Sequence, residues 1–175
     1  SDAEKKKTEY FSRFALSHLS EMRILEKGGV LGKENKEWRN VSEHSIAEAV
    51  AADILGEALG ADRERLVRSV LIHDWFKRRE VEAMKEYGGG EGYKRTAEED
   101  EEFLRKSGVP DAVISLAHAN VLRGVDSEYL KGRSLEEKIF HFLDTSTIST
   151  ELVDFREKLR QAKEKEHIVN FSESF

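Results

Sequence analysis

The sequence predicts an all-α fold, a single helical domain that spans residues 1–175. Apolar residues recur with the spacing of amphipathic helices along most of the chain, and no segment alternates apolar and polar residues as a half-buried strand does. Proline, which interrupts helices, occurs once, as Pro110. Cysteine is absent, so neither disulfides nor thiolate chemistry are expected, and a chain of this length buries a core without them.

The first expected helix covers about residues 3–26. Its apolar stripe includes Phe11, Phe14, Leu19 and Met22, which recur at helical spacing. The segment KGGVLGKENKEW that follows is expected to be a loop because glycine and polar residues dominate it.

The next two helices have recognisable start signals. Ser42 is expected to cap a helix over about residues 43–59, which ends before Gly60. Asp62 is expected to cap the helix after it, which continues to about Lys77.

Shorter helices are expected in the rest of the chain. The segment YGGGEGYKRT is expected to be a flexible connector because glycine is concentrated there, and it lacks the strand and the Lys-Ser/Thr pair of a phosphate-binding P-loop. The expected helices cover about residues 79–87, 96–107, 110–122, 134–147 and 150–166.

The composition excludes several classes of function. Charged residues make up 37% of the chain and the net charge is −6, so the surface has no general attraction for nucleic acid or for an anionic membrane. No apolar run reaches the roughly 18 residues of a membrane span, and the N-terminal region lacks a signal-peptide core. We therefore expect a cytoplasmic protein that binds neither membrane nor nucleic acid, and a homodimer is compatible with the sequence.

Four polar residues stand out because each lies in an apolar helical segment: His44, His73, Asp74 and Asp144. A buried carboxylate is costly unless charge or hydrogen bonds compensate it, and Asp144 lies among Phe and Leu residues. Two imidazoles and two carboxylates suit a divalent first-row metal ion and leave positions for water and substrate. Each residue alone is more often structural, but the ordered set of four favours a metal site.

Three further residues are candidates for roles around that site. Lys77 shares a helix face with His73 and Asp74, and a protonated amine cannot bind a metal but favours a nearby phosphate. His118 lies on an apolar helix, where a core histidine and a site residue are about equally expected. Glu48, one turn after His44, could orient that imidazole through a hydrogen bond.

These residues resemble the signature of the HD-domain metal-dependent phosphohydrolases, a His, a His-Asp pair and a distant Asp on a helical bundle. The resemblance covers about residues 10–150. It implies an HD-type helical bundle in which His44, His73, Asp74 and Asp144 bind the metal ion.

The two halves of the chain resemble different branches of that family. HLSEMRIL and NVSEHSIAEAVAADIL are similar to segments of the 5′-deoxynucleotidases. GVPDAVISLAHANVLRG and SLEEKIFHFLDTSTIS are similar to segments of hydrolases that act on dinucleoside polyphosphates.

The chain also departs from both branches. The deoxynucleotidases have a Glu where this chain has Lys77, and their phosphate-contacting Arg falls near Lys27. The dinucleoside hydrolases have an additional His in the region of Thr96. Without that His a second metal site lacks a ligand, so we expect one divalent ion (Mn, Co, Fe, Zn, Ni or Mg), and His118 remains as a candidate for a phosphate contact.

The expected function is metal-dependent hydrolysis of a phosphate ester, in a nucleotide or another small phosphorylated molecule. Asp74 is expected to accept a proton from the attacking water, and Lys77 and His118 to neutralise phosphoryl charge. The alternative is an HD domain with little or no catalytic activity that binds a nucleotide or metal as a sensor, and Lys77 in place of Glu keeps this alternative open.

Overall fold

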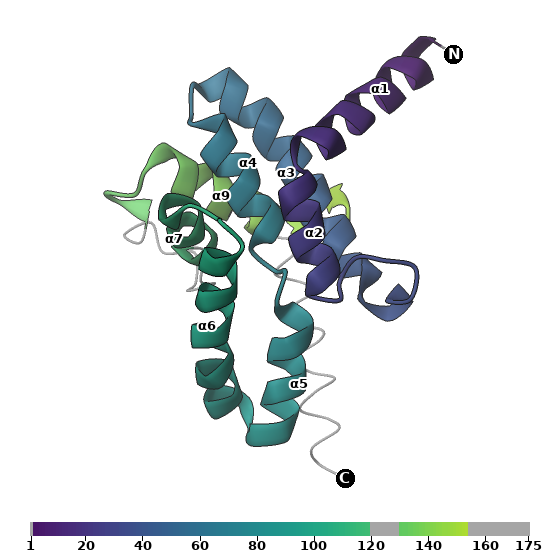
Figure 1. Cartoon of the computed structure of the whole chain (residues 1–175). Helices are drawn as coiled ribbons and strands as arrows, with labels where there is room; N and C mark the ends of the chain where they lie inside the picture. Colours follow the sequence, from purple (N-terminus) through teal and green to yellow (C-terminus); the bar gives the residue numbers. More distant parts are fainter. Residues whose placement is uncertain (1, 120–129, 154–175) are drawn as a thin grey trace.

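The computed structural model, which describes residues 2–119 and 130–153, is mostly helical, as the sequence predicts (Figure 1). None of the described helices combines the length and apolar character needed to cross a bilayer. The helices are α1 (Asp2–Ser17), α2 (Leu19–Lys27), α3 (Arg39–Leu59), α4 (Arg63–Ile72), α5 (Lys77–Tyr87), α6 (Gly89–Lys106), α7 (Asp111–Ala119) and α9 (Leu135–Ser146), with a 3-10 turn, η1 (Lys36–Trp38), before α3.

The expectation that the chain contains no strand is wrong in one place. Strands β1 (Thr147–Ile148) and β2 (Glu151–Leu152) form a short antiparallel pair directly after α9. Ser149, in the turn between them, has a positive φ of 55°. The expected helix over 150–166 is therefore wrong at β2, and its part beyond residue 153 lies outside the described residues.

The first expected helix is interrupted at His18, whose backbone (φ −122°, ψ 32°) is not helical. Helix α1 ends before it and α2 starts after it, so that α1 leaves the body of the molecule at an angle (Figure 1). The His18 ring packs on the buried Phe14, with 4.8 Å between ring centroids. The apolar stripe continues across the break, and for this reason periodicity alone does not reveal it.

Helix α3 starts at Arg39, earlier than expected, and Ser42 is not its cap. The Ser42 side chain is buried and its hydroxyl donates a hydrogen bond to the Arg39 carbonyl, a contact that serine makes inside helices. The end of α3 at Gly60 (φ 72°) and the cap of α4 are as predicted, since the Asp62 carboxylate accepts a hydrogen bond from the Arg65 amide.

The segment expected to be a flexible connector is the start of helix α6. Helices α5 and α6 lie side by side as a hairpin (Figure 1). A Cβ on Gly92 would lie 2.5 Å from the carbonyl oxygen of Ala83, so only glycine fits where the two helices cross. Gly92 therefore allows close packing of two helices, although the glycine-rich composition of the segment suggested a loop.

Helix α4 ends at Ile72, short of the end expected near Lys77, because residues 73–76 form a turn before α5. The helices predicted over 79–87, 96–107 and 134–147 correspond to α5, α6 and α9. The helix predicted over 110–122 is α7 as far as Ala119, and its remainder lies outside the described part of the chain. Helix α9 starts with a capping box in which Ser134 and Glu137 each accept the other's backbone N–H.

The core lies between α2, α3, α4, α7 and α9, and α4 is in contact with each of the other four. Helix α4 is buried on nearly every side, because its neighbours cover both its faces. The core side chains without solvent exposure include Leu25, Ala52, Leu66, Val70, Leu71, Phe140 and Leu143. This packing brings the C-terminal end of α4, where His73 follows, between α3 and α9.

We expect Gly92→Ala to destabilise the α5–α6 hairpin, because the new methyl group would force two backbones apart. Overpacking of this kind typically costs about 1–3 kcal/mol of unfolding free energy. Urea denaturation of the purified variant measures it.

Gly90→Ala is the matched control, because a Cβ at Gly90 meets nothing within 4 Å. In a helix that change is expected to stabilise by up to about 1 kcal/mol. Equal effects of the two substitutions would contradict the close-packing explanation.

Candidate metal centre

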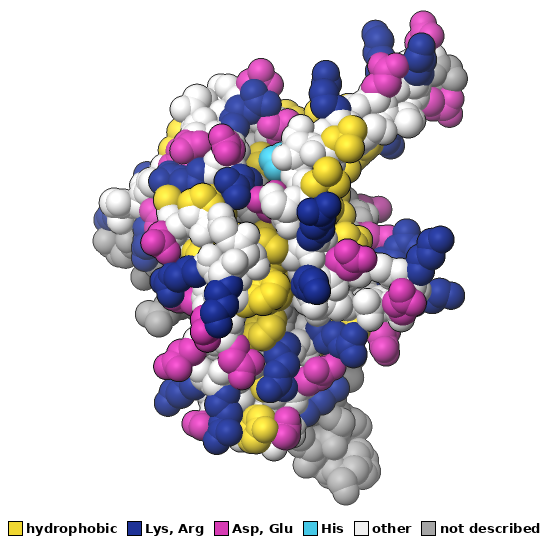
Figure 2. Space-filling view, viewed as in Figure 1, with side chains coloured by type: hydrophobic (Ala, Val, Ile, Leu, Met, Phe, Trp, Pro, Cys, Tyr) yellow, Lys and Arg dark blue, Asp and Glu magenta, His cyan; other side chains and the backbone are white. Residues whose placement is uncertain are grey.

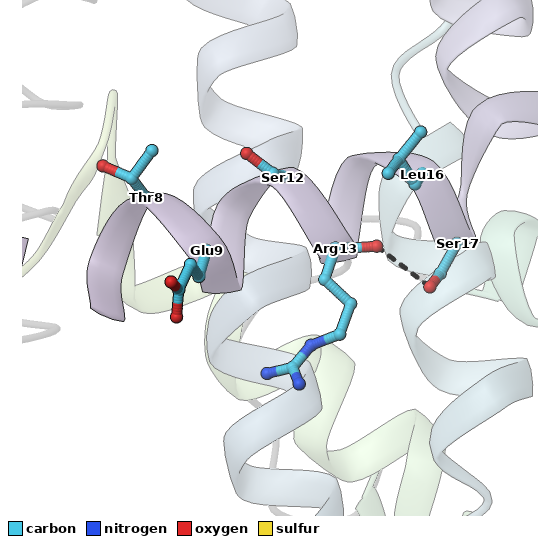
Figure 3. A pocket seen from close by; sticks show the side chains of 6 residues that line it. All are labelled: Thr8, Glu9, Ser12, Arg13, Leu16 and Ser17. Atoms are coloured by element: carbon cyan, nitrogen blue, oxygen red, sulfur yellow. Dashed lines mark hydrogen bonds between the residues drawn. The ribbon is translucent and has the colours of Figure 1, made fainter. Parts of the chain in front are cut away.

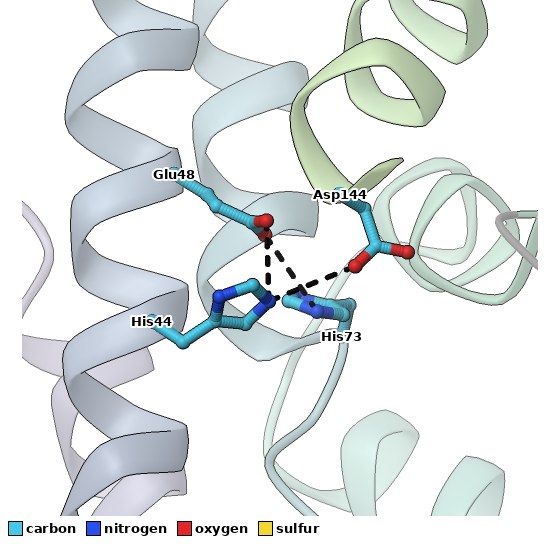
Figure 4. A group of neighbouring side chains, drawn as sticks. All are labelled: His44, Glu48, His73 and Asp144. Atoms are coloured by element: carbon cyan, nitrogen blue, oxygen red, sulfur yellow. Dashed lines mark ion pairs between the residues drawn. The ribbon is translucent and has the colours of Figure 1, made fainter. Parts of the chain in front are cut away.

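Four side chains from three segments converge in the core: His44 and Glu48 from α3, His73 from the end of α4, and Asp144 from α9 (Figure 4). One nitrogen or oxygen atom of each lies within 4.8 Å of the corresponding atoms of the others. Among residues 2–119 and 130–153, this is the group of His and acidic residues that could hold a metal ion. We call it the histidine–carboxylate group.

The carboxylates in this group face the imidazole nitrogens. Glu48 Oε1 lies 3.1 Å from His44 Nε2, and Glu48 Oε2 lies 3.8 Å from His73 Nε2. Asp144 Oδ1 lies 3.6 Å from His44 Nε2 on the other side (Figure 4). These side chains are close enough together for a single cation to bind between them.

Backbone carbonyls set the orientation of both imidazoles. His73 Nδ1 lies 2.8 Å from the carbonyl oxygen of Val70, and His44 Nδ1 lies 3.2 Å from that of Ser149. Because a carbonyl only accepts, each Nδ1 carries the hydrogen, and in the neutral imidazole the Nε2 lone pair then points into the group. This tautomer is assigned from the hydrogen-bond partners. Such an arrangement is the usual one for histidines that bind metals.

Burial makes the charge of this group costly without a cation. Glu48 has no exposed surface, and His73 Nε2 is buried and makes no hydrogen bond to any described residue. A carboxylate in such a place needs a neighbouring positive charge, from a metal ion or from a proton on an imidazole.

The imidazole pKa values reflect the same demand. Burial by itself lowers the pKa of His44, but its hydrogen bond to Asp144 and the charge of Glu48 outweigh burial, so the pKa lies above its usual value. For His73, burial is likewise outweighed, in this case by the charges of Asp74 and Glu48, and its pKa is also raised.

Three of the four ligands predicted from the sequence lie in the group, and Asp74 lies at its edge. Its Oδ2 is 3.6 Å from His73 Nε2, whereas its Oδ1 is 3.6 Å from Lys77 Nζ. Glu48, expected only to orient His44, takes the inner position. The sequence signal for Glu48 was its i, i+4 spacing from His44. This spacing predicts that the two residues share a helix face, but it does not predict that Glu48 belongs to the group itself.

Lys77, the first residue of α5, lies next to Asp74 as expected, although the continuous helix on which that expectation rested is interrupted by the turn at 73–76. Its Nζ is 3.6 Å from Asp74 Oδ1 and 3.7 Å from Glu80 Oε2. Burial alone lowers the lysine pKa, but the carboxylate charges outweigh it and raise the pKa above the usual value. The side chain is therefore a cation beside the group.

His118 is separate from the histidine–carboxylate group. It lies on α7, and its Nε2 is 2.9 Å from Oδ2 of Asp100 on α6. The sequence contained no pattern that pointed to Asp100, because the contact joins two helices across a gap of 18 residues.

A surface hollow of about 490 Å³ lies elsewhere, along one face of α1 (Figure 3). It contains none of the candidate residues, and the Ser17 hydroxyl in it already donates a hydrogen bond to the Arg13 carbonyl. Its lining residues are Thr8, Glu9, Ser12, Arg13, Leu16 and Ser17.

Comparisons with known proteins assign no family to the chain. No family model, no curated protein and no solved structure matches it. What the site can do chemically therefore follows from its own residues.

We expect Mn²⁺ or Co²⁺ to raise the melting temperature of the protein and Asp144→Ala to abolish this shift. An ion at 100 times its dissociation constant stabilises the folded state by about 2.7 kcal/mol. Differential scanning fluorimetry with and without metal measures the shift.

Glu98→Gln, on the exposed side of α6, is the control and should respond to metal as the wild type does. A metal-induced shift of wild-type size in Asp144→Ala would remove Asp144 from the site.

Proposed function

We propose that the protein is a metal-dependent phosphohydrolase of the HD-domain type, acting on a nucleotide or another small phosphate ester. The observation that carries this proposal is the histidine–carboxylate group, with both Nε2 atoms directed inward by backbone carbonyls. The ordered resemblance of His44, His73–Asp74 and Asp144 to the HD signature supports the same function.

The ion would be held by His44, His73 and Asp144, with Asp74 completing the set and Glu48 supplying buried negative charge beside it. Imidazole and carboxylate ligands together suit Mn, Co, Fe, Zn or Ni, and Mg is also accommodated by the carboxylates. A divalent ion held there would polarise a phosphoryl oxygen and lower the pKa of a water molecule towards neutrality.

Asp74 and Lys77 would carry the remaining chemistry. Asp74 is partly exposed at the edge of the group, where its carboxylate can accept a proton from the attacking water. Lys77 Nζ lies on the far side of that carboxylate and would neutralise charge on the phosphoryl oxygens. A phosphate contact by His118 would compete with two carboxylates, because its Nε2 is bonded to Asp100 and its Nδ1 lies 3.7 Å from Glu101 Oε1.

The distribution of charge favours a small substrate over a polymer such as nucleic acid. Lys and Arg side chains are interspersed with Asp and Glu on the face shown in Figure 2, without a broad positive region. The net charge of −6 adds no long-range attraction for nucleic acid. Recognition of the phosphate would then depend on the bound ion and on Lys77.

The second candidate function is a sensor that binds a metal ion or a nucleotide without hydrolysing it. The contact between Lys77 and Asp74 favours it, because this ammonium occupies the carboxylate that would otherwise accept a proton. In the family that the sequence resembles, a Glu stands at this position in the deoxynucleotidases.

An activity screen separates the two functions. Purified protein is incubated with nucleoside monophosphates, dinucleoside polyphosphates and a generic phosphate ester, each with Mn²⁺, Co²⁺ or Mg²⁺, and released phosphate or nucleotide is measured. We expect metal-dependent turnover that Asp144→Ala abolishes. Nucleotide binding by calorimetry without turnover on any compound would support the sensor.

We expect Asp74→Ala to lose bound metal, measured by elemental analysis after dialysis, because it removes a carboxylate ligand. Glu48→Gln is the comparison, since it keeps the shape of the side chain and removes its charge. Full metal occupancy in Asp74→Ala, with loss in Glu48→Gln, would transfer the ligand role to Glu48.

We expect Lys77→Ala to keep its metal and fold but to lose about 10²–10⁴ in turnover, the scale of a positioned charge-stabilising group. Lys85→Ala, on the exposed side of the same helix, is the matched control and should retain turnover. Wild-type turnover in Lys77→Ala would assign this residue to the surface.

A further inference from the structure

Asp100, on α6, is a buried carboxylate that the proposed reaction does not use. Its side chain is shared between two elements: Oδ1 accepts a hydrogen bond from Trp75 Nε1 at 2.5 Å, and Oδ2 lies 2.9 Å from His118 Nε2. The residue is only 8% exposed. A buried carboxylate with a different donor on each oxygen is a strong constraint on both partners.

Trp75 belongs to the turn, residues 73–76, that joins α4 to α5 and carries two of the candidate site residues. It directly follows Asp74, is 2% exposed, and stacks its indole on Phe103 of α6, with 4.5 Å between centroids. The Trp75 amide bonds to the Ile72 carbonyl, and the Lys77 amide bonds to the Asp74 carbonyl. The position of the indole therefore sets the backbone from which Asp74 and Lys77 project.

The same turn is confined on its other side by the end of α2. A Cβ on Gly28 would lie 1.9 Å from the Trp75 carbonyl oxygen, so the two backbones are in direct contact. The turn is therefore held between α2 on one side and Asp100 on the other.

His118 is the variable partner of Asp100. The hydrogen bond to Asp100 raises the pKa of His118 above its usual value, against the opposing effect of burial. Glu101 on α6, whose Oε1 lies 3.7 Å from Nδ1, and Glu80 on α5 act in the same direction. Deprotonation of His118 removes the positive charge from its ion pair with Asp100, so the attraction between the two side chains weakens although the carboxylate still accepts a hydrogen bond.

We propose that Asp100 is a positioning residue of the candidate site, which couples the charge on His118 to the placement of the turn that carries Asp74 and leads into Lys77. When His118 is charged, Asp100 is held between the imidazolium and the indole. When His118 is neutral, the carboxylate is held less firmly and the indole, with its turn, is less constrained. Only the effect on turnover rests on the proposed function, because the coupling itself is a property of the folded chain.

NMR of the full chain tests the coupling directly. The indole Nε1–H resonance of Trp75, identified by its loss in Trp75→Phe, should shift with pH along the same titration curve as the His118 ring. The Trp38 indole provides an internal reference. We expect the Trp75 titration to disappear in His118→Gln and in Asp100→Asn, which retains an oxygen to accept from the indole.

A Trp75 resonance that stays constant while His118 titrates, or one that still titrates in His118→Gln, would overturn the proposal. Thermal unfolding shows whether each variant is folded, and Glu98→Gln is the matched carboxylate-to-amide change on α6. His118→Gln provides an independent test if Asp100→Asn does not fold.

Turnover distinguishes failure of this proposal from failure of the proposed function. In an active enzyme, Asp100→Asn should lower turnover by up to about 10²-fold, the scale of a misplaced site residue, and remove the limb of the pH profile that follows His118. Coupled titration without turnover in the wild type supports the positioning role and rejects hydrolysis. Turnover and a pH profile equal to the wild type in Asp100→Asn would reject the positioning role and leave hydrolysis standing.

Discussion

The buried carboxylate of Glu48 is the constraint on which the centre of the molecule depends. It has no contact with solvent, and it faces the Nε2 atoms of His44 and His73. A charge in this position destabilises the fold unless a cation lies beside it. The segments that carry His44 and His73 therefore meet at Glu48. A metal ion or a proton must be present there in the folded protein.

Common structural elements, a helix end and a tight turn, orient the two imidazoles beside Glu48. Helix α4 ends so that the Val70 carbonyl accepts from His73, and the turn between β1 and β2 presents the Ser149 carbonyl to His44. The short strand pair thus has a definite role: it holds a residue with positive φ where its carbonyl orients an imidazole. The His73 ring also packs edge-on against Phe140 of the core, 5.3 Å between centroids.

Trp75 is one of the side chains that join the α5–α6 hairpin to this centre, together with Leu104 of α6 in the core. Trp75 contacts Asp100 and Phe103 of α6 while its backbone touches Gly28 at the end of α2. Close approaches at Gly28 and Gly92 let the backbones come into direct contact where any larger residue would separate them. The placement of Asp74 and Lys77 consequently depends on packing against helices that contain no member of the histidine–carboxylate group.

The sequence by itself determined the helical class, the end of α3 at Gly60, the start of α4 after Asp62, and the convergence of His44, His73 and Asp144. These follow from local rules, because periodicity and capping act within a few residues, and polar residues in apolar helices need partners. Only the tertiary structure decided that Glu48 lies inside the group and Asp74 at its edge, that α1 and α2 separate, and that Asp100 joins two helices. Periodicity predicts which face of a helix is buried, but contacts between segments distant in the sequence decide which residues pack against that face.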